Sequence, residues 1–158
     1  MGTKYNGLLE RIPEFRKSIK DNQIVNQLPL GYGQIISINT GKYGLGGGDT
    51  VIIMHGNGGN PVFESISVAA SVSISFPISG EVGRVWLTDE YGNLVIDPEV
   101  MIQEIKGWSL DWSVAAGLKV NKLRTGNGYI LHVESISPEI SAQLQASFTK
   151  FIDYQNYL

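Results

Sequence analysis

One stretch of this chain constrains its fold more than any other. From Leu110 to Val120 every second residue is apolar, and polar or small residues such as Asp111 and Lys119 lie between them. A period of two places these two sets on opposite faces of a β-strand. A strand needs neighbours, because its backbone N–H and C=O groups must find hydrogen-bond partners. The chain is therefore expected to build a sheet around residues 108–120.

A second alternation and several shorter apolar runs can supply those neighbours. Residues 62–76 hold a second long alternation, in which serines separate the apolar side chains from Ala70 to Phe76. The shorter runs are separated by Gly, Pro, Asp or Asn turns and cover residues 34–39, 50–55, 82–88, 93–96, 100–106 and 129–136. Short strands at regular intervals are typical of antiparallel sandwiches and jelly rolls. We therefore predict an all-β, jelly-roll-like sandwich of about nine strands.

The two ends of the chain differ from this pattern. Residues 5–20 are predicted as a helix, because five apolar residues lie at helical spacing, namely Leu8, Leu9, Ile12, Phe15 and Ile19. Proline lacks the N–H of a helix interior, so either the helix begins near Ile12 or its first turn is broken at Pro13. Residues 140–158 alternate like a strand, which is our prediction, with a helix as the alternative. We assign residues 1–32 to an N-terminal helical arm and connector, and residues 33–158 to a single β-sandwich domain.

Composition narrows the classes of function. Charged residues make up 17% of the 158 residues, below the usual quarter, and the net charge is −3. A broad basic surface is thus absent, and we expect no nucleic-acid partner. There is no cysteine and there are two histidines, so we expect neither a metal nor another cofactor. The sequence also lacks an apolar run long enough for a spanning helix, and its first residues do not resemble a signal peptide.

One segment invites an enzymatic interpretation. Val51–Gly59 resembles the strand and oxyanion-hole loop of α/β-hydrolases, in which an apolar strand runs into His-Gly-x-Gly, here His55–Gly58. The nucleophile elbow that should follow has one candidate, Gly107–Asp111, where Asp111 replaces the final glycine. A strand pattern follows that candidate, whereas the hydrolase fold requires a helix. We therefore expect no enzyme and assign no catalytic residue.

Three functions from different classes fit these observations. The first is a non-enzymatic structural protein that forms a homo-oligomer or larger assembly, such as a capsid or appendage subunit in a virion or extracellular assembly. Its expected subunit interface consists of Leu8, Leu9, Ile12 and Phe15, with Ser113 and Ala115 from the small, uncharged face of the long strand. The alternative is a module that binds a glycan or another surface ligand on Trp86 and Trp108. The second alternative is a β-type pore former whose N-terminal helix contacts a membrane.

Overall fold

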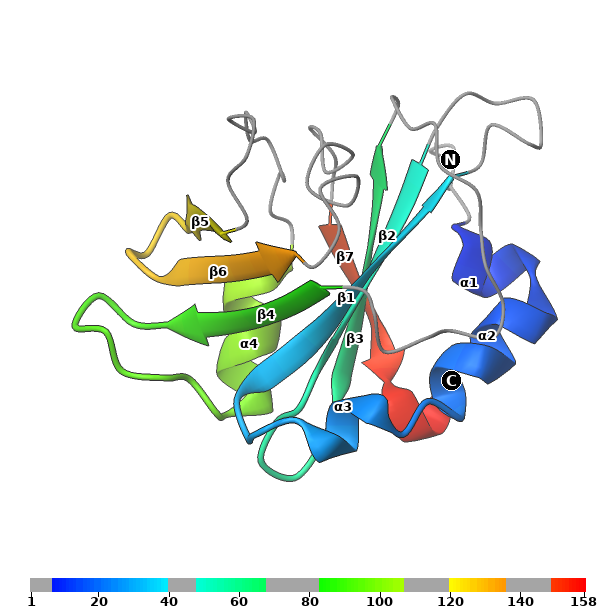
Figure 1. Ribbon diagram of the computed structural model, residues 1–158, viewed down its shortest axis with the longest axis horizontal. Coiled ribbons are helices and arrows are strands. Elements are labelled where there is room, and N and C mark those ends of the chain that lie inside the picture. The colour runs from blue at the N-terminus through cyan, green and yellow to red at the C-terminus, as the bar shows by residue number, and fades with distance from the viewer. Residues whose placement is uncertain (1–6, 40–47, 68–82, 107–119, 136–148) are drawn as a thin grey trace.

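The computed structural model describes residues 7–39, 48–67, 83–106, 120–135 and 149–158. Within these residues, seven strands form one antiparallel sheet in the order β5-β6-β4-β1-β2-β3-β7 (Figure 1). The strands are β1 (Tyr32–Asn39), β2 (Gly48–Met54), β3 (Pro61–Ser67), β4 (Gly83–Thr88), β5 (Val120–Arg124), β6 (Ile130–Ser135) and β7 (Thr149–Tyr154). The predicted antiparallel, mainly β character is confirmed. All the described strands belong to one sheet, so they do not confirm a nine-stranded sandwich.

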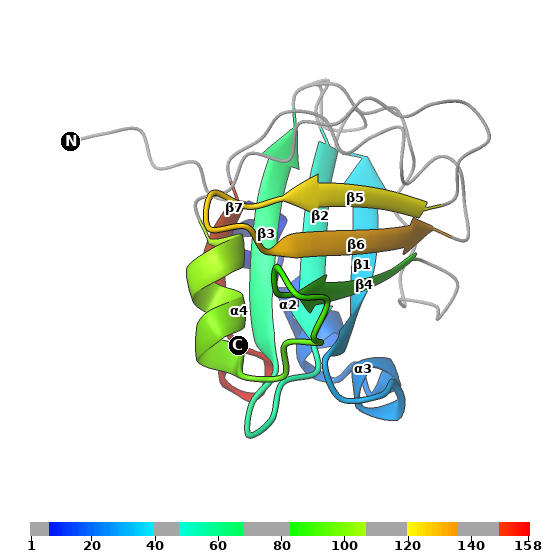
Figure 2. The same ribbon diagram turned by 90° about the vertical axis from the view of Figure 1, so that its left-hand side faces the viewer.

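Helices cover parts of both faces of this sheet (Figures 1 and 2). The helices are α1 (Leu8–Arg11), α2 (Pro13–Lys20), α3 (Ile24–Gln27) and α4 (Pro98–Ile105), and a 3-10 turn, Gln155–Tyr157, follows β7. Helices α1, α2 and α3 share a buried cluster with one face, and α4 shares a second cluster with the other. None of the helices in the described ranges is long and apolar enough to cross a membrane.

Side chains of strand β2 are buried on both faces of the sheet. Val51 and Ile53 point toward α1 and α2, whereas Ile52 and Met54 point toward α4, and all four are at most 1% exposed. A continuous apolar run suits a strand that is buried on both faces. The short turn after it, residues 56–60, returns the chain into β3, so the β2–β3 connection is a hairpin and not a strand-to-helix loop of the hydrolase type.

The N-terminal residues form two short helices that pack on the chain's own sheet. Pro13 is the first residue of α2, where a missing N–H costs little, and Ile12 lies between α1 and α2. Leu8, Leu9 and Phe15 are at most 1% exposed in the cluster beneath these helices. The predicted break at the proline is therefore present, and the described part of the predicted arm is docked.

A buried carboxylate lies where α1 meets the sheet. Glu64 on β3 is fully buried, and its Oε2 accepts a hydrogen bond of 3.3 Å from the backbone N–H of Leu9. Its Oε1 has no hydrogen-bond partner in the described part of the chain. Gly7 makes this arrangement possible, because a Cβ at that position would overlap the Glu64 carboxylate.

The segment Val100–Lys106 was predicted as a strand, and this prediction is wrong, because residues 98–105 form α4. Asp97 caps the helix by accepting a 3.0 Å hydrogen bond from the N–H of Glu99, and Pro98 occupies the first helical position. Met101 and Ile105, one turn apart, are fully buried against the sheet. The Asp-Pro pair that was interpreted as a break is a helix start.

The segment 93–96, predicted as a strand, forms a single bridge between Leu94 and Thr88 rather than a strand. A tight turn precedes it, in which the Asp89 carboxylate accepts hydrogen bonds from the N–H groups of Asn93 (2.8 Å) and Tyr91 (2.9 Å). These bonds, that from the Asn93 backbone above all, lower the pKa of Asp89 below its ordinary 3.8.

Three long patterns remain, and each is described in part. Of residues 62–76, residues 62–67 lie in β3 and residues 68–76 lie outside the described residues. Most of the alternating stretch at 108–120 lies outside the described residues, and β5 begins at Val120. Residues 140–148 also lie outside them, whereas Thr149–Tyr154 form strand β7, in agreement with the predicted strand. This strand pairs with β3 and forms the edge of the sheet that is remote from β6.

We predict that Gly7→Ala destabilises the protein by about 1–3 kcal/mol, because the added methyl group displaces the Glu64 carboxylate and leaves a buried N–H without its partner. Urea denaturation measures the change. Gly126→Ala is the matched control, since its added methyl group meets nothing within 4 Å. Equal stability of the two variants would contradict this account of Gly7.

We also predict a pH-dependent effect of Asp89→Asn. The folded state lowers the Asp89 pKa, so the charged carboxylate stabilises the turn above its ordinary pKa. That stabilisation is lost as the pH falls through the lower folded-state pKa. The free energy of unfolding of the native protein should therefore exceed that of the variant near pH 6, and the difference should shrink below pH 3.8. A difference that is constant over this range would show that the turn does not depend on the charge.

Candidate functional site

The half of the sheet that β4 and β6 form is covered on one face only. Side chains alternate along β4, so Val85 and Leu87 are buried toward α4 while Trp86 points the opposite way. On that opposite side, α1, α2 and α3 pack over β1, β2, β3 and β7. No helix in the described residues packs over Trp86. We call this surface the open face, and it consists of Tyr32, Arg84, Trp86, Leu94, His132 and Glu134.

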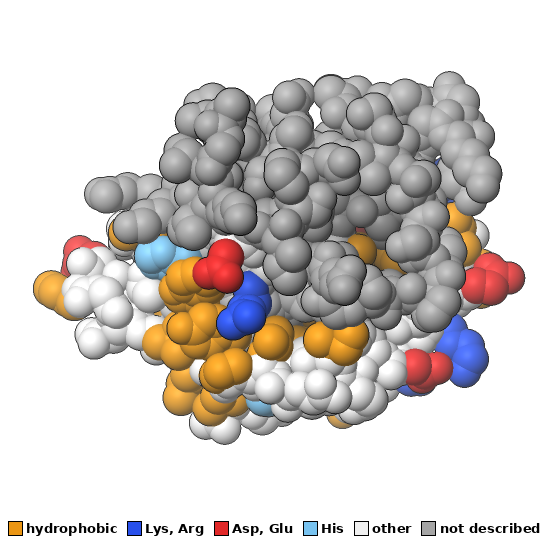
Figure 3. Space-filling view, in the orientation of Figure 1, with side chains coloured by type: hydrophobic (Ala, Val, Ile, Leu, Met, Phe, Trp, Pro, Cys, Tyr) orange, Lys and Arg blue, Asp and Glu red, His pale blue; other side chains and the backbone are white. Residues whose placement is uncertain are grey.

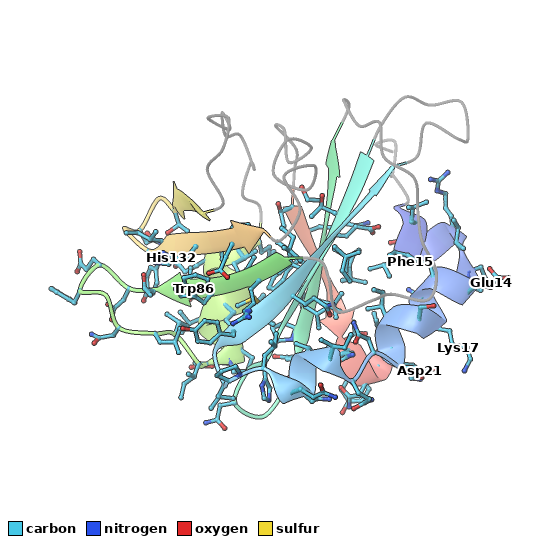
Figure 4. The ribbon with its side chains drawn as sticks, in the orientation of Figure 1. Glu14, Phe15, Lys17, Asp21, Trp86 and His132 are labelled. Carbon is cyan, nitrogen blue, oxygen red and sulfur yellow. The ribbon has the colours of Figure 1, made fainter. Side chains whose placement is uncertain are left out.

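An aromatic row crosses the open face. Tyr32, Trp86 and His132 stand directly opposite one another on the adjacent strands β1, β4 and β6. All three side chains are partly exposed. Figure 4 shows Trp86 and His132 side by side on the face turned to the viewer. The row follows from strand pairing and places three rings in one line.

The rings of this row pack against one another. The Trp86 and His132 planes are parallel to within 2° with centroids 5.1 Å apart, and the Tyr32 and Trp86 centroids are 5.3 Å apart with planes tilted by 36°. Parallel planes at this centroid separation form an offset stack between the adjacent strands β4 and β6. A 2.9 Å hydrogen bond between Thr88 Oγ1 and His132 Nε2 fixes the imidazole. The three rings therefore form one packed row that is partly exposed.

Two opposite charges accompany the row. Arg84 and Glu134 stand opposite each other on β4 and β6, one step along the same face from Trp86 and His132. Arg84 is exposed and Glu134 is partly exposed. Among the described residues, ion pairs join Lys17 to Asp21 and Lys150 to Glu10, and neither pair involves the open face. The open face thus carries one cation and one anion without ion-pair partners in the described chain.

Apolar side chains extend the open face past the aromatic row. Leu94 forms an antiparallel bridge with Thr88, so the two side chains share a face, and Leu94 is 38% exposed. It also lies against the backbone of Gly31, next to Tyr32. Figure 3 shows hydrophobic side chains gathered over β1 and β4, with an acidic and a basic group beside them. This combination of exposed aromatic, aliphatic and charged groups is typical of an interaction surface.

Two hollows elsewhere are weaker candidates. One, of about 470 Å³, lies along the outer side of α2, where Glu14, Lys17 and Asp21 point outward while Phe15 points toward the sheet (Figure 4). The other, of about 320 Å³, is lined by carboxamide side chains and the Gly58–Gly59 turn. Its central amides bond one another, as in the 3.1 Å bond from Asn60 to Gln155. These hydrogen bonds join the C-terminal turn to the β2–β3 hairpin, so the amides have a structural role.

The residues that the sequence singled out are dispersed. Of the expected interface, Leu8, Leu9 and Phe15 are buried within the chain itself, and Ile12 packs against the same cluster. Three further residues lie outside the described ranges, namely Trp108, Ser113 and Ala115. Trp86 is on the open face. His55 bonds the carbonyl oxygen of Leu28 at 2.8 Å, which accounts for its position.

Sequence reasoning missed most of the open face. Tyr32 was assigned to the connector, although it lies in β1, and Trp86 was placed in a strand whose neighbours were unknown. Alternation within residues 83–88 and 130–135 could have placed Trp86 opposite Val85, and His132 opposite Leu131 and Val133. No local signal could have shown that β4 lies between β1 and β6, which is what brings the three rings together.

Two further features of the described residues bear on the chemistry of the site. They contain no group of three His, Cys, Asp or Glu side chains that could hold a metal ion. The Thr88 hydroxyl, at 9% exposure, is nearly buried and orients His132. Comparison with protein-family models, curated proteins and solved structures gives no match to this chain.

Proposed function

We propose that this protein is a non-enzymatic structural subunit that associates with copies of itself through the open face. The observation that carries the proposal is the partly exposed Tyr32–Trp86–His132 row on a sheet face that no described helix covers. A monomer that leaves such a row in water forgoes the free energy of burying its apolar surface. A second copy of the chain can bury this surface, and copies are present wherever the protein itself is present.

The composition of the open face supports a protein partner. Tryptophan, tyrosine and arginine dominate the residues whose truncation weakens protein–protein complexes most, and the open face has one of each. A sugar would stack on a free ring face, but His132 and Tyr32 occupy the two sides of the Trp86 ring. The geometry therefore favours self-association over the glycan platform that Trp86 suggested.

The proposed function is the one expected from the sequence, but its interface lies on the open face rather than on the N-terminal helices. The N-terminal side chains that were expected at the interface pack inside the chain, and the open face takes their place. The low charge and the serine-rich strands still motivate a structural setting, such as a capsid or an extracellular appendage. We propose that setting by analogy, because a fold does not determine a function.

We predict that Trp86→Ser weakens self-association by about 30-fold or more, the effect expected when a central interface tryptophan is truncated. Sedimentation velocity over a dilution series measures it. Loss of the two ring contacts also lowers the stability of the sheet by about 1–2 kcal/mol, so circular dichroism must confirm that the variant is folded.

Tyr91→Ser is the matched control, because Tyr91 is an aromatic residue of the β4 turn that is 81% exposed and does not belong to the row. It should associate like the native protein. A native chain that stays monomeric at millimolar concentration would contradict the proposal. A folded Trp86→Ser variant that associates as strongly as the control would also contradict it.

A further inference from the structure

We propose that two copies meet through their open faces about a two-fold axis that runs above the sheet, parallel to β4 and β6 and midway between them. This inference rests on the proposed self-association and adds its symmetry and its polar contacts. The axis places Arg84 of each copy against Glu134 of the other. It also places Trp86 of each copy over His132 of the other.

The arrangement follows from the register of the two strands. Arg84 and Glu134 are directly opposite each other in the β4–β6 pair, and Trp86 and His132 form the pair next along the same face. A rotation by 180° about this axis exchanges the positions of β4 and β6. It therefore brings each β4 residue over its own β6 neighbour in the second copy. One axis satisfies both pairs at once.

The charges make the open face complementary to itself. A face with a single sign of charge would repel its own copy, whereas a cation and an anion at exchanged positions attract. Arg84 and Glu134 are cross-strand neighbours, yet they form no ion pair within the described chain. In the two-fold pair each finds an opposite charge, and every favourable contact occurs twice, as in all isologous interfaces.

Charge reversal tests this arrangement. Arg84→Glu places two acidic groups together at both exchanged positions, and Glu134→Arg places two basic groups together there. We expect each single variant to associate at least about tenfold more weakly than the native chain. The double variant restores both attractions and should return to within about threefold of the native dissociation constant, since the rest of the interface is unchanged.

Mixtures give the signature of a two-fold axis. In an equimolar mixture of the two single variants, an acidic group meets a basic group at both contacts of every mixed pair, so association should be restored. In a mixture of the double variant with the native chain, like charges meet at both contacts of a mixed pair, so the two proteins should sort into separate pairs. Sedimentation velocity with one component fluorescently labelled distinguishes these cases.

Lys106→Glu and Glu99→Arg are the matched controls, because they make the same charge changes at exposed positions at the two ends of α4 and beyond the open face. Both should associate like the native chain. Thermal unfolding of the reversal variants shows whether they remain folded, which is expected because neither Arg84 nor Glu134 is buried.

The outcomes separate the two proposals. A native chain that never associates overturns the proposed function and this inference with it. A native chain that associates while the single reversals do not weaken it overturns the two-fold arrangement alone. Weakened single variants that fail to complement each other in the mixture also overturn it, since Arg84 and Glu134 would then contact other groups.

Discussion

The structure depends on the burial of strand β2 on both faces. Val51, Ile52, Ile53 and Met54 are all at most 1% exposed, and such a run requires packed layers above and below the sheet. The N-terminal helices provide one layer and α4 provides the other. The first layer reaches across β1, β2, β3 and β7 and leaves the corresponding face of β4 and β6 without a described helix. The open face is thus a consequence of a core that is centred on β2.

The sequence predicted the strands better than their arrangement. Short apolar runs identified β1, β2, β4 and β6. It failed at α4, because Val100, Met101 and Ile102 form a short apolar run that fits either a strand or a buried helix. The Asp97 cap and Pro98 decide in favour of the helix. The pairing of β7 with β3 involves residues almost a hundred positions apart, and no local pattern contains it.

The same limit applies to the candidate site. Trp86 was singled out as a possible platform for a ligand, but its partners come from β1 and β6, which are distant in sequence. Leu8, Leu9 and Phe15 were expected on the apolar face of one helix, whereas they lie on α1 and α2 and face the same buried cluster. Whether such a face meets the chain's own sheet or another chain depends on tertiary structure. Here it packs on the sheet over Val51, Ile53 and Val62.

The central claim is that the open faces of two copies lie against each other. The chain has no cysteine, so Tyr91→Cys and Gln103→Cys each create a unique position for a spin label, in the β4 turn and on the outer side of α4 respectively. Pulsed dipolar spectroscopy then measures the distance between copies. Two sheets packed face to face lie about 10 Å apart, so the labels at residue 91 should be separated by less than about 30 Å, and those at residue 103 by at least about 10 Å more. A shorter separation at residue 103 than at residue 91 would contradict the account.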